Sequence, residues 1–375
     1  MNNALKIKDL HYKYHDKSEF TLNISELELA EKDSLAIFGK SGSGKSTLIK
    51  ICAMLQNGFS GEIFLFGENI LQPEREKRLE ISRKIAILFQ DAPIFDASVF
   101  DNIAIGLKIR HTPRETIKNE VESALEALNL KEIKNAHARE ISGGQARRVC
   151  LARVLALKPS LIFLDEPFHS LDSINKFQIM KEYKALIKSA GITSVIITHD
   201  KYEALGLAKR MAVIEKGTII QQGSVSECFR NPVSREAAML GGRNMIYYGE
   251  ATSYSNELSY IKCSMPYNAK SEISFFAAAK YQPGDKICVM ISPDDVSIHP
   301  ADSSNETSSA LNHYRGRITS FSHYEFGMMI AIATGSGAEI ESYITNRSFE
   351  RLNLELGTEI NVSIKATSIK TFPLP

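Results

Sequence analysis

A glycine-rich loop between an apolar run and a helical pattern constrains the fold of this chain more than any other segment. Residues 39–47 read GKSGSGKST; the apolar run SLAIF precedes them, and the helical pattern TLIKICAMLQ begins at their end. The glycines let the backbone curl so that consecutive N–H groups face inward and hold phosphate oxygens. The helix that follows adds its positive N-terminal end to the same anion. This order of strand, loop and helix predicts an α/β fold that binds a phosphorylated ligand.

The loop contains every position of the G-x-x-x-x-G-K-S pattern, which makes a chance glycine cluster the weaker interpretation. Lys45 is expected to contact the β- and γ-phosphates of a nucleoside triphosphate, and the Ser46 hydroxyl to ligate Mg²⁺. The phosphate-binding residues that the pattern predicts are Gly39, Lys40, Ser41, Gly42, Ser43, Gly44, Lys45, Ser46 and Thr47.

Further along the chain, apolar strands alternate with helices. LIFL at 161–164 and SVIIT at 194–198 read as buried strands, and the segment between them, 174–190, has a helical pattern. Buried strands that alternate with helices predict a parallel sheet covered on both faces.

Two other patterns extend this core. Residues 5–66 alternate apolar and polar positions, which is typical of antiparallel strands with one solvated face. Residues from about 91 to 158 are richer in helical pattern, and one helix face carries Ile117, Val121, Leu125 and Leu128. We therefore expect a nucleotide-binding domain at 1–234: a P-loop NTPase core with an antiparallel β subdomain and an inserted helical subdomain.

An acidic pair ends the first of the later apolar strands. Asp165 can point from this strand end toward a metal held by Ser46, and Glu166 can polarise an attacking water. An acidic pair could instead cap the next helix, but its combination with the phosphate loop favours catalysis. His199, alone, would be read as a structural histidine at a strand end.

The segment Ser142, Gly143, Gly144 and Gln145 lies between the phosphate loop and the acidic strand, immediately before the helical pattern ARRVCLARVLAL. Two glycines at a helix N-terminus again offer backbone N–H groups and a positive helix end, and so form a second anion half-site. Because the phosphate loop already surrounds its own ligand, the second half-site is expected to serve a triphosphate on another subunit.

These motifs, in this order, resemble those of the ATP-binding cassette (ABC) ATPases from about residue 5 to residue 230. The resemblance implies a head-to-tail homodimer that encloses two ATP molecules, with the SGGQ segment of one copy completing the site of the other. It implies that His199 contacts the γ-phosphate and that Gln90, in ILFQDAP, reaches the metal and the water. It also matches Asp172, in SLD, to a loop that crosses the dimer interface, and Tyr14 to the aromatic that stacks on adenine, with Tyr12 as a close rival.

The chain departs from the common family pattern at Ile141, where leucine is usual, at Ala146, where glutamine often follows, and at His169, where a small residue is frequent. None of these changes removes a catalytic group, so an inactive ATP-binding subunit is disfavoured.

Composition restricts the possible partners. The 375 residues carry a net charge of +1, which gives no global basic field for nucleic acid. Five scattered cysteines form no C-x-x-C pair, and no secretion signal or apolar stretch of about 20 residues is visible. A membrane process would be served from the cytoplasm, at the membrane face, through partners. The resemblance implies that residues 91–102 contact a permease subunit, although Phe95 and Phe100 could equally pack internally.

After residue 231 the pattern changes to short strands and glycine turns, which predicts an all-β, OB-like barrel domain at 243–375. Residues from about 310 to 372 resemble the molbindin-like (TOBE) module of importer ATPases. Lys365 and Thr367 are suited to an oxyanion, but one lysine and one threonine are weak evidence, and a module that only dimerises is favoured.

Together, these features predict the ATPase subunit of an importer that uses Mg²⁺ and ATP, with a permease and an extracytoplasmic binding protein as partners and no nucleic acid. Tungstate or molybdate is the expected cargo; sulfate, ferric iron, phosphonate and polyamine are alternatives. Two other classes are a soluble ABC ATPase that acts on nucleic acid or the ribosome and an oxyanion sensor or storage protein. The first usually shows paired cassettes, coiled coils or basic patches, and intact Lys45, Glu166 and His199 argue against the second.

Overall fold

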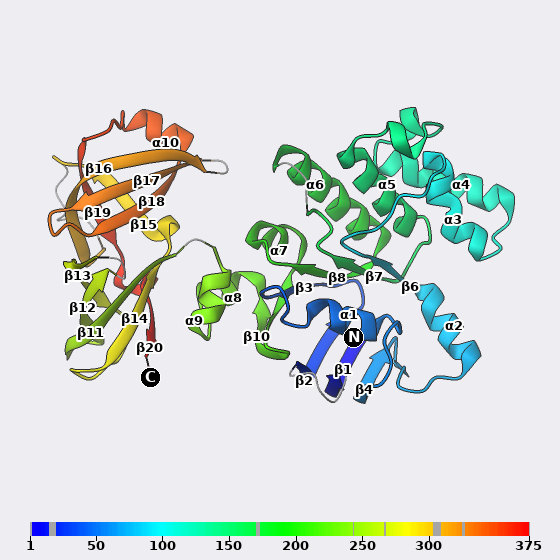
Figure 1. The fold of residues 1–375 in the computed structure, drawn as a ribbon, viewed down its shortest axis with the longest axis horizontal. Coiled ribbons are helices and arrows are strands. Elements are labelled where there is room, and N and C mark those ends of the chain that lie inside the picture. Colours follow the sequence, from blue (N-terminus) through cyan, green and yellow to red (C-terminus); the bar gives the residue numbers. More distant parts are fainter. Residues whose placement is uncertain are drawn as a thin grey trace. The chain divides into compact units, whose positions relative to one another are not determined.

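The computed structural model describes residues 2–14, 20–169, 173–242, 244–265, 268–302, 309–324 and 327–374. The chain divides into two compact units, Met1–Val233 and Ser234–Pro375. Figure 1 shows the elements of each unit.

The first unit is built on a ten-stranded sheet with the order β5-β4-β1-β2-β10-β9-β3-β8-β7-β6. Its strands are β1 (Asn3–Lys13), β2 (Thr21–Ala30), β3 (Ser34–Phe38), β4 (Ser60–Leu65), β5 (Glu68–Asn69), β6 (Ile85–Leu88), β7 (Leu161–Asp165), β8 (Thr193–Thr198), β9 (Arg210–Glu215) and β10 (Thr218–Ser224). Strand β3 pairs in parallel with β8 and β9, and β7 pairs in parallel with β6 and β8. Strands β1, β2, β4 and β5 are antiparallel to their neighbours within this group.

Helices cover both faces of the parallel part. They are α1 (Lys45–Cys52), α2 (Arg75–Lys84), α3 (Val99–Ile109), α4 (Arg114–Ala127), α5 (Gly143–Leu155), α6 (Ser173–Ala190), α7 (Lys201–Leu207) and α8 (Val225–Arg230). In Figure 1, α1 lies on one side of strands β3, β8 and β7, and α5 and α6 lie on the other.

Strand β7 explains why the apolar runs are continuous. Ile162 and Leu164 pack into the core formed with α3 to α6, whereas Leu161 and Phe163 pack into the core formed with α1 and the antiparallel strands. Successive side chains of a strand point to opposite faces, so a strand covered on both faces must be apolar at every position. The predicted face of α4 is also buried: Ile117, Val121, Leu125 and Leu128 are at most 8% exposed.

The described part of the second unit consists of β-strands, two short α-helices and short 3-10 helices. It contains α9 (Arg235–Leu240), β11 (Met245–Ser255), β12 (Leu258–Met265), β13 (Asn268–Ala277), β14 (Lys286–Ile291), β15 (Val296–Pro300), β16 (Asn312–Tyr324), β17 (Gly327–Thr334), β18 (Glu339–Thr345), α10 (Asn346–Arg351), β19 (Glu359–Ile364) and β20 (Lys370–Pro373). Two five-stranded sheets, β13-β12-β11-β14-β20 and β15-β19-β16-β17-β18, share one apolar core. The predicted fold class, an α/β core followed by an all-β unit, is confirmed.

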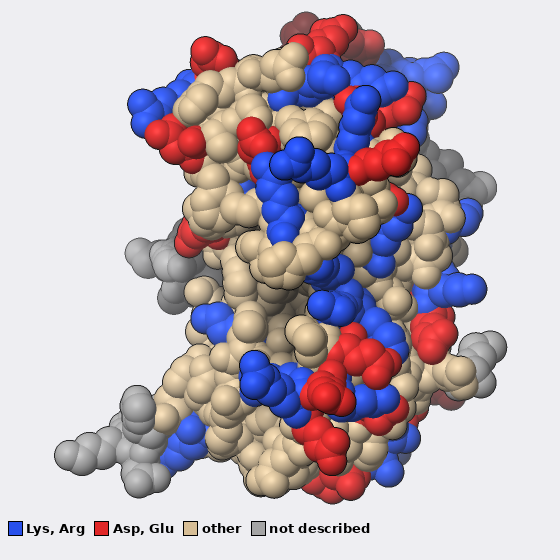
Figure 2. Space-filling view, turned by 90° about the vertical axis from the view of Figure 1, so that its right-hand side faces the viewer, with Lys and Arg blue, Asp and Glu red and all other residues tan. Residues whose placement is uncertain are grey.

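Figure 2 shows the side of the molecule that lies on the right in Figure 1, where Lys and Arg side chains are interspersed with Asp and Glu. Among the described residues, no helix is long and apolar enough to cross a membrane.

Candidate active site

The glycine loop adopts a conformation that only glycine accommodates. Gly42 and Gly44 have φ of 78° and 106°, in the left-handed region. A Cβ atom on Gly39 would lie 2.3 Å from the carbonyl oxygen of Ile214, and one on Gly44 would lie 2.7 Å from the ring of Phe20. Helix α1 begins at the next residue, Lys45, so the loop leads its backbone N–H groups directly into a helix N-terminus.

The side chain of Lys45 folds back onto the loop. Its Nζ donates to the carbonyl oxygens of Gly39 and Lys40, both at 2.8 Å. Burial lowers the pKa of Lys45, while Glu166 and Asp165 act in the opposite direction. The ammonium group therefore lies in the centre of the curled backbone, close to two carboxyl groups.

The residues around the loop suit a triphosphate and a hard cation. The Ser43 hydroxyl is buried and has no hydrogen-bond partner among the described residues, which leaves a donor for an anionic oxygen. Burial raises the pKa of the nearby Asp165 carboxyl group and Glu166 raises it further, while the Ser46 hydroxyl acts in the opposite direction. Hydroxyl and carboxylate oxygens are ligands that Mg²⁺ accepts alongside phosphate oxygens and water.

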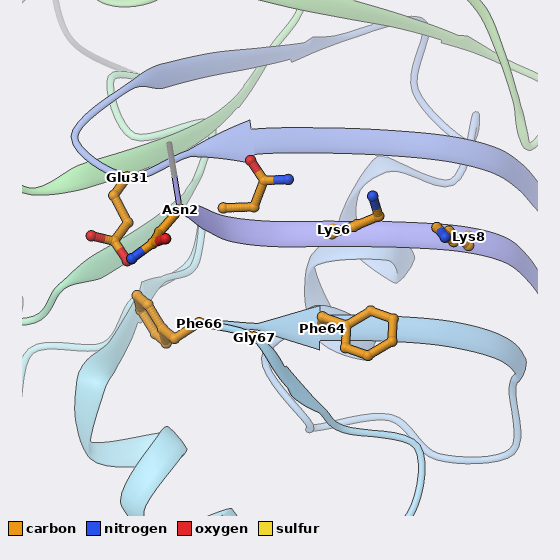
Figure 3. A pocket seen from close by; sticks show the side chains of 8 residues that line it. Asn2, Lys6, Lys8, Glu31, Phe64, Phe66 and Gly67 are labelled. Atoms are coloured by element: carbon orange, nitrogen blue, oxygen red, sulfur yellow. The ribbon is translucent and has the colours of Figure 1, made fainter.

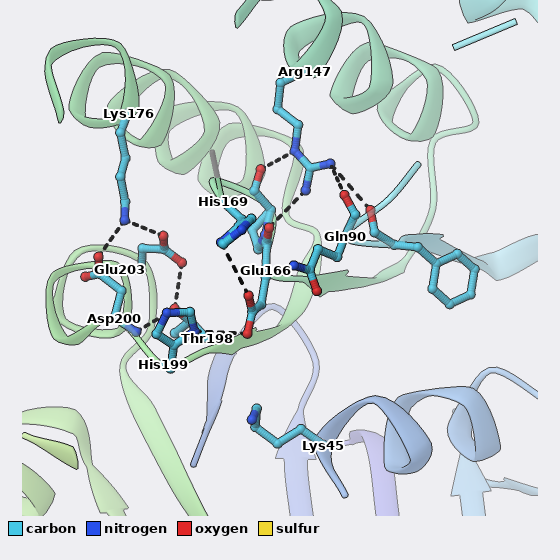
Figure 4. A network of polar contacts seen from close by, with 12 residues as sticks. Lys45, Gln90, Arg147, Glu166, His169, Lys176, Thr198, His199, Asp200 and Glu203 are labelled. Atoms are coloured by element: carbon cyan, nitrogen blue, oxygen red, sulfur yellow. Dashed lines mark hydrogen bonds and ion pairs between the residues drawn. The ribbon is translucent and has the colours of Figure 1, made fainter. Parts of the chain in front are cut away.

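Glu166 projects from the end of β7 with a left-handed backbone, φ 43°. Its N–H donates to the carbonyl oxygen of Ile197 in the neighbouring strand β8 at 3.0 Å. The carboxylate lies between two imidazoles: Oε1 is 2.9 Å from Nδ1 of His199, and Oε2 is 3.7 Å from Nδ1 of His169 (Figure 4). The structure thus brings the predicted catalytic carboxylate and the predicted γ-phosphate histidine into direct contact.

A polar cluster fixes the segment that carries His199. Asp200 caps α7 by accepting from the N–H groups of Tyr202 and Glu203, at 2.7 and 3.0 Å. Lys176 pairs with Glu203 at 2.7 Å and with Asp200, and the Thr198 hydroxyl donates to Glu203 at 2.7 Å. The sequence interpretation did not identify Lys176; the THDKYE segment, with its two carboxylates beside the histidine, is the signal that could have prompted a search for a cation.

Gln90 follows β6 with an exposed side chain, and Figure 4 shows it beside Glu166. The backbone carbonyls of both residues accept hydrogen bonds from Arg147, at 3.0 Å for Gln90 and 3.1 Å for Glu166. Sequence interpretation missed Arg147, because an arginine in a helix pattern carries no distinguishing signal.

The SGGQ segment forms the first turn of α5, whereas the sequence interpretation placed it before the helix. Ser142 is the N-cap: its Oγ accepts from the N–H of Gln145 at 3.3 Å, and the Gln145 side chain accepts from the N–H of Ser142 at 2.9 Å. This capping box, readable from the S-x-x-Q spacing, is the reason that the helix begins at Gly143, three residues before the predicted start at Ala146. A Cβ atom on Gly143 or Gly144 would meet no atom within 4 Å, so nothing inside the described chain demands glycine there.

The two tyrosine candidates for stacking on adenine differ in exposure. Tyr12 is 4% exposed and belongs to the core, whereas Tyr14 is 41% exposed. The Tyr14 hydroxyl is 2.9 Å from Oγ1 of Thr47, at the end of the phosphate loop. Asp172, the predicted interface residue, lies outside the described residues.

The segment 91–102 combines internal packing and exposure. Phe100 packs against the helical core, whereas Phe95 is 42% exposed beneath the guanidinium of Arg153, 4.8 Å from its ring centroid. Asn102, 1% exposed, holds this segment by donating to the carbonyl oxygen of Phe95 and accepting from its N–H, both at 2.9 Å.

A groove of about 510 Å³ on β1 and β4 is lined by Asn2, Asn3, Lys6, Lys8, Glu31, Phe64, Phe66 and Gly67 (Figure 3). It contains none of the predicted site residues. In the second unit, Lys365 and Thr367 are exposed at the short 3-10 helix Ala366–Ser368.

A glycine phosphate loop, a strand-end Asp–Glu pair and a strand-end histidine on one parallel sheet define a P-loop ATPase cassette. A family profile described as ABC transporter matches residues 22–169, and a TOBE domain profile matches residues 308–371. The chain belongs to the ABC transporter family and is an ATPase of the cassette type.

Among its relatives, the molybdate/tungstate import ATP-binding protein WtpC of Pyrococcus abyssi is 31% identical over 361 residues, which cover 95% of this chain and 97% of that protein. The spermidine/putrescine import ATP-binding protein PotA of Borreliella afzelii is 30% identical over 334 residues, covering 88% and 90%.

Solved structures agree with the first unit. CbiO1 of Clostridium perfringens, part of the ABC transporter complex cbiONQ, is 30% identical with a TM-score of 0.57 and covers 62% of this chain and 92% of that one. A dimeric ATP-binding cassette in a post-hydrolysis state, bound to ADP and Pi, is 26% identical with a TM-score of 0.53 and covers 59% and 98%.

Proposed function

We propose that this chain is the ATP-hydrolysing subunit of an ABC importer and that Glu166 is its general base. The observation that carries the proposal is the contact of 2.9 Å between Glu166 and His199, at the ends of two adjacent strands that also present Asp165 to the phosphate loop. This arrangement supports a site in which Glu166 acts as the base, beside His199 and the phosphate loop, at the C-terminal ends of the parallel strands.

In the proposed reaction, water attacks the γ-phosphorus of ATP. Glu166 accepts the proton of the water as the new P–O bond forms, and ADP leaves with the electrons of the broken bond. Lys45 and the backbone N–H groups of residues 39–47 stabilise the charge on the phosphate oxygens, and His199 orients the γ-phosphate. Ser46, Asp165 and Gln90 would hold Mg²⁺, which would supply positive charge to the phosphate oxygens.

The site is proposed to be completed by a second copy of the chain. Gly143 and Gly144 have open space where side chains would be, and they lie in the first turn of α5, where backbone N–H groups suit an anion. We assign Ser142 to Gln145 to the ATP of the partner copy, Asp172 to the interface between copies, and Tyr14 to the adenine.

The relatives support the proposals for cargo and location. Two relatives matched over nearly the whole chain are molybdate/tungstate import proteins, which favours tungstate or molybdate; the polyamine import relatives make spermidine the main competitor. We place the chain at the cytoplasmic face of the membrane as a peripheral subunit. Its partners would be a permease, contacted through 91–102, where Phe95 is exposed, and an extracytoplasmic binding protein.

The reaction is tested by E166Q, which keeps the size of the side chain and removes the base. We expect E166Q to lose hydrolysis and to form a stable ATP-bound dimer, detected by size-exclusion chromatography with and without ATP. Hydrolysis by E166Q at the wild-type rate would refute the assignment. Cargo is tested by uptake of tungstate, molybdate, sulfate and spermidine in a strain that lacks this gene.

A further inference from the structure

The guanidinium group of Arg147 connects the two strand ends that carry the proposed catalytic groups. Its Nη1 donates to the carbonyl oxygens of Gln90 at 3.0 Å and Phe89 at 3.4 Å. Its Nη2 donates to the carbonyl oxygen of Glu166 at 3.1 Å, and its Nε to that of Pro167. Figure 4 shows the side chain reaching from α5 to both segments.

These contacts bridge neighbouring parallel strands just beyond their last paired residues. Strands β6 and β7 pair as far as Leu88 and Leu164, and the carbonyls that Arg147 binds begin one residue after Leu88 and two residues after Leu164. No carboxylate of the described residues forms an ion pair with Arg147, so carbonyl dipoles alone receive its N–H groups. A planar fork of five donors suits such an array, whereas an ammonium group cannot span it.

The contact with Arg147 matters because the backbone of Glu166 has an unfavourable conformation. A non-glycine residue at φ 43° is strained and keeps this conformation only where its surroundings hold it. Three backbone contacts hold it: its N–H donates to the carbonyl oxygen of Ile197 in β8, and its C=O accepts from the N–H of His169 at 3.2 Å and from Arg147. Without Arg147, the carbonyl oxygen of Glu166 is bound only within its own turn, to His169, and loses its link to α5.

We propose that Arg147 is a positioning residue that holds the backbone of Glu166 and Gln90 in a fixed position relative to α5. Helix α5 begins with Ser142 to Gln145, so a movement of that first turn is transmitted through Arg147 to the strand ends at which water is activated. The inference rests on the proposed function, since it assumes that Glu166 is the base.

The experiment compares R147Q and R147K with R148Q in the full chain. Arg148 is the matched control because it is the next residue of the same helix, yet it contacts the Leu128 carbonyl oxygen at 3.3 Å and Glu182 at 3.4 Å, away from the site. We expect both Arg147 variants to lower kcat for ATP hydrolysis by about tenfold or more, because small misplacements of catalytic groups have large kinetic effects. The Kd for ATP should stay within about twofold of wild type, since the lost contact acts on kcat alone. R148Q should unfold at a lower urea concentration than wild type and keep the wild-type kcat.

A second readout separates positioning from general loss of structure. In an E166Q background, R147K should still form the ATP-dependent dimer, because the capping box of Ser142 and Gln145 does not involve Arg147. Wild-type kcat in both Arg147 variants would overturn the inference, and so would a fall in kcat matched by equal loss of ATP binding or of the dimer. If the wild-type protein hydrolyses ATP and E166Q does not, the proposed function stands whatever the Arg147 variants show.

Discussion

The Nδ1 atom of His199 lies 2.9 Å from Oε1 of Glu166, so the groups at the ends of β8 and β7 form one unit. Both strands end at the same edge of the sheet, and their parallel pairing brings Asp165 opposite Ile197 two residues before His199. An imidazole that contacts this carboxylate and, as proposed, the γ-phosphate would hold the reacting groups in line.

Replacing His199 by alanine is expected to lower kcat for ATP hydrolysis by about 10²-fold, with little change in ATP affinity, because orientation is lost while the phosphate loop is untouched. H169A is the control, since His169 lies 3.7 Å from the other carboxylate oxygen. Steady-state phosphate release and equilibrium binding of a fluorescent ATP analogue distinguish the two effects. Equal losses in H199A and H169A would contradict a special role for His199.

Gly144→Ala tests whether the second glycine of SGGQ serves a partner. A Cβ there meets no atom of the described chain within 4 Å, and alanine is favoured over glycine inside a helix by about 1 kcal/mol. We expect G144A to unfold at the same or a higher urea concentration and yet to lose ATP-dependent dimerisation and hydrolysis. Wild-type hydrolysis by G144A would remove the reason for assigning this turn to the partner's ATP.

The fold and the nucleotide motifs were predictable because each depends on local pattern. Leu161 to Leu164 are apolar at every position, and Gly42 and Gly44 occupy left-handed conformations that the loop spacing implies. The role of Arg147 was not predictable, since its partners are backbone carbonyls 19 to 58 residues away and any residue type supplies a carbonyl. The capping box of Ser142 was readable from the sequence and was overlooked.

Tyr14 and Tyr12 are expected to respond differently to alanine. Y14A should weaken ATP binding by about 1–3 kcal/mol, the usual contribution of an aromatic that stacks on a base, without a change in stability. Y12A should destabilise the cassette by about 3–5 kcal/mol, because Tyr12 is 4% exposed and packed in the core. Binding of ATP and GTP measured beside urea unfolding tests both. Unchanged nucleotide affinity in Y14A would exclude it as the stacking residue.

Lys176 provides a test of how the loop that carries His199 is anchored. K176M leaves Glu203, whose side chain is 4% exposed, without its cation, and removal of one partner of a buried pair costs about 3 kcal/mol. K108M is the control: Lys108 pairs with Asp101 at an exposed position, where a pair contributes no more than about 1 kcal/mol. Circular dichroism of the helices during urea unfolding measures both variants.

The difference in the free energy of unfolding between wild type and K176M should depend on pH, because the pKa values of Asp200 and Lys176 are both shifted. Burial opposes ionisation of Asp200, but the hydrogen bonds from Lys176 and from the N–H groups of Glu203 and Tyr202, together with the charge of Lys176, lower its pKa below 3.8. This stabilisation is present above pH 3.8 and is lost as the pH falls through the folded value. Burial likewise opposes the charge of Lys176, but Asp200 and Glu203 raise its pKa above 10.5, so its stabilisation is lost as the pH rises through that higher value. The stability gap between wild type and K176M should therefore be flat from about pH 5 to 10 and shrink outside this range. A gap that widens in acid would show that Lys176 does not stabilise the ionised form of Asp200.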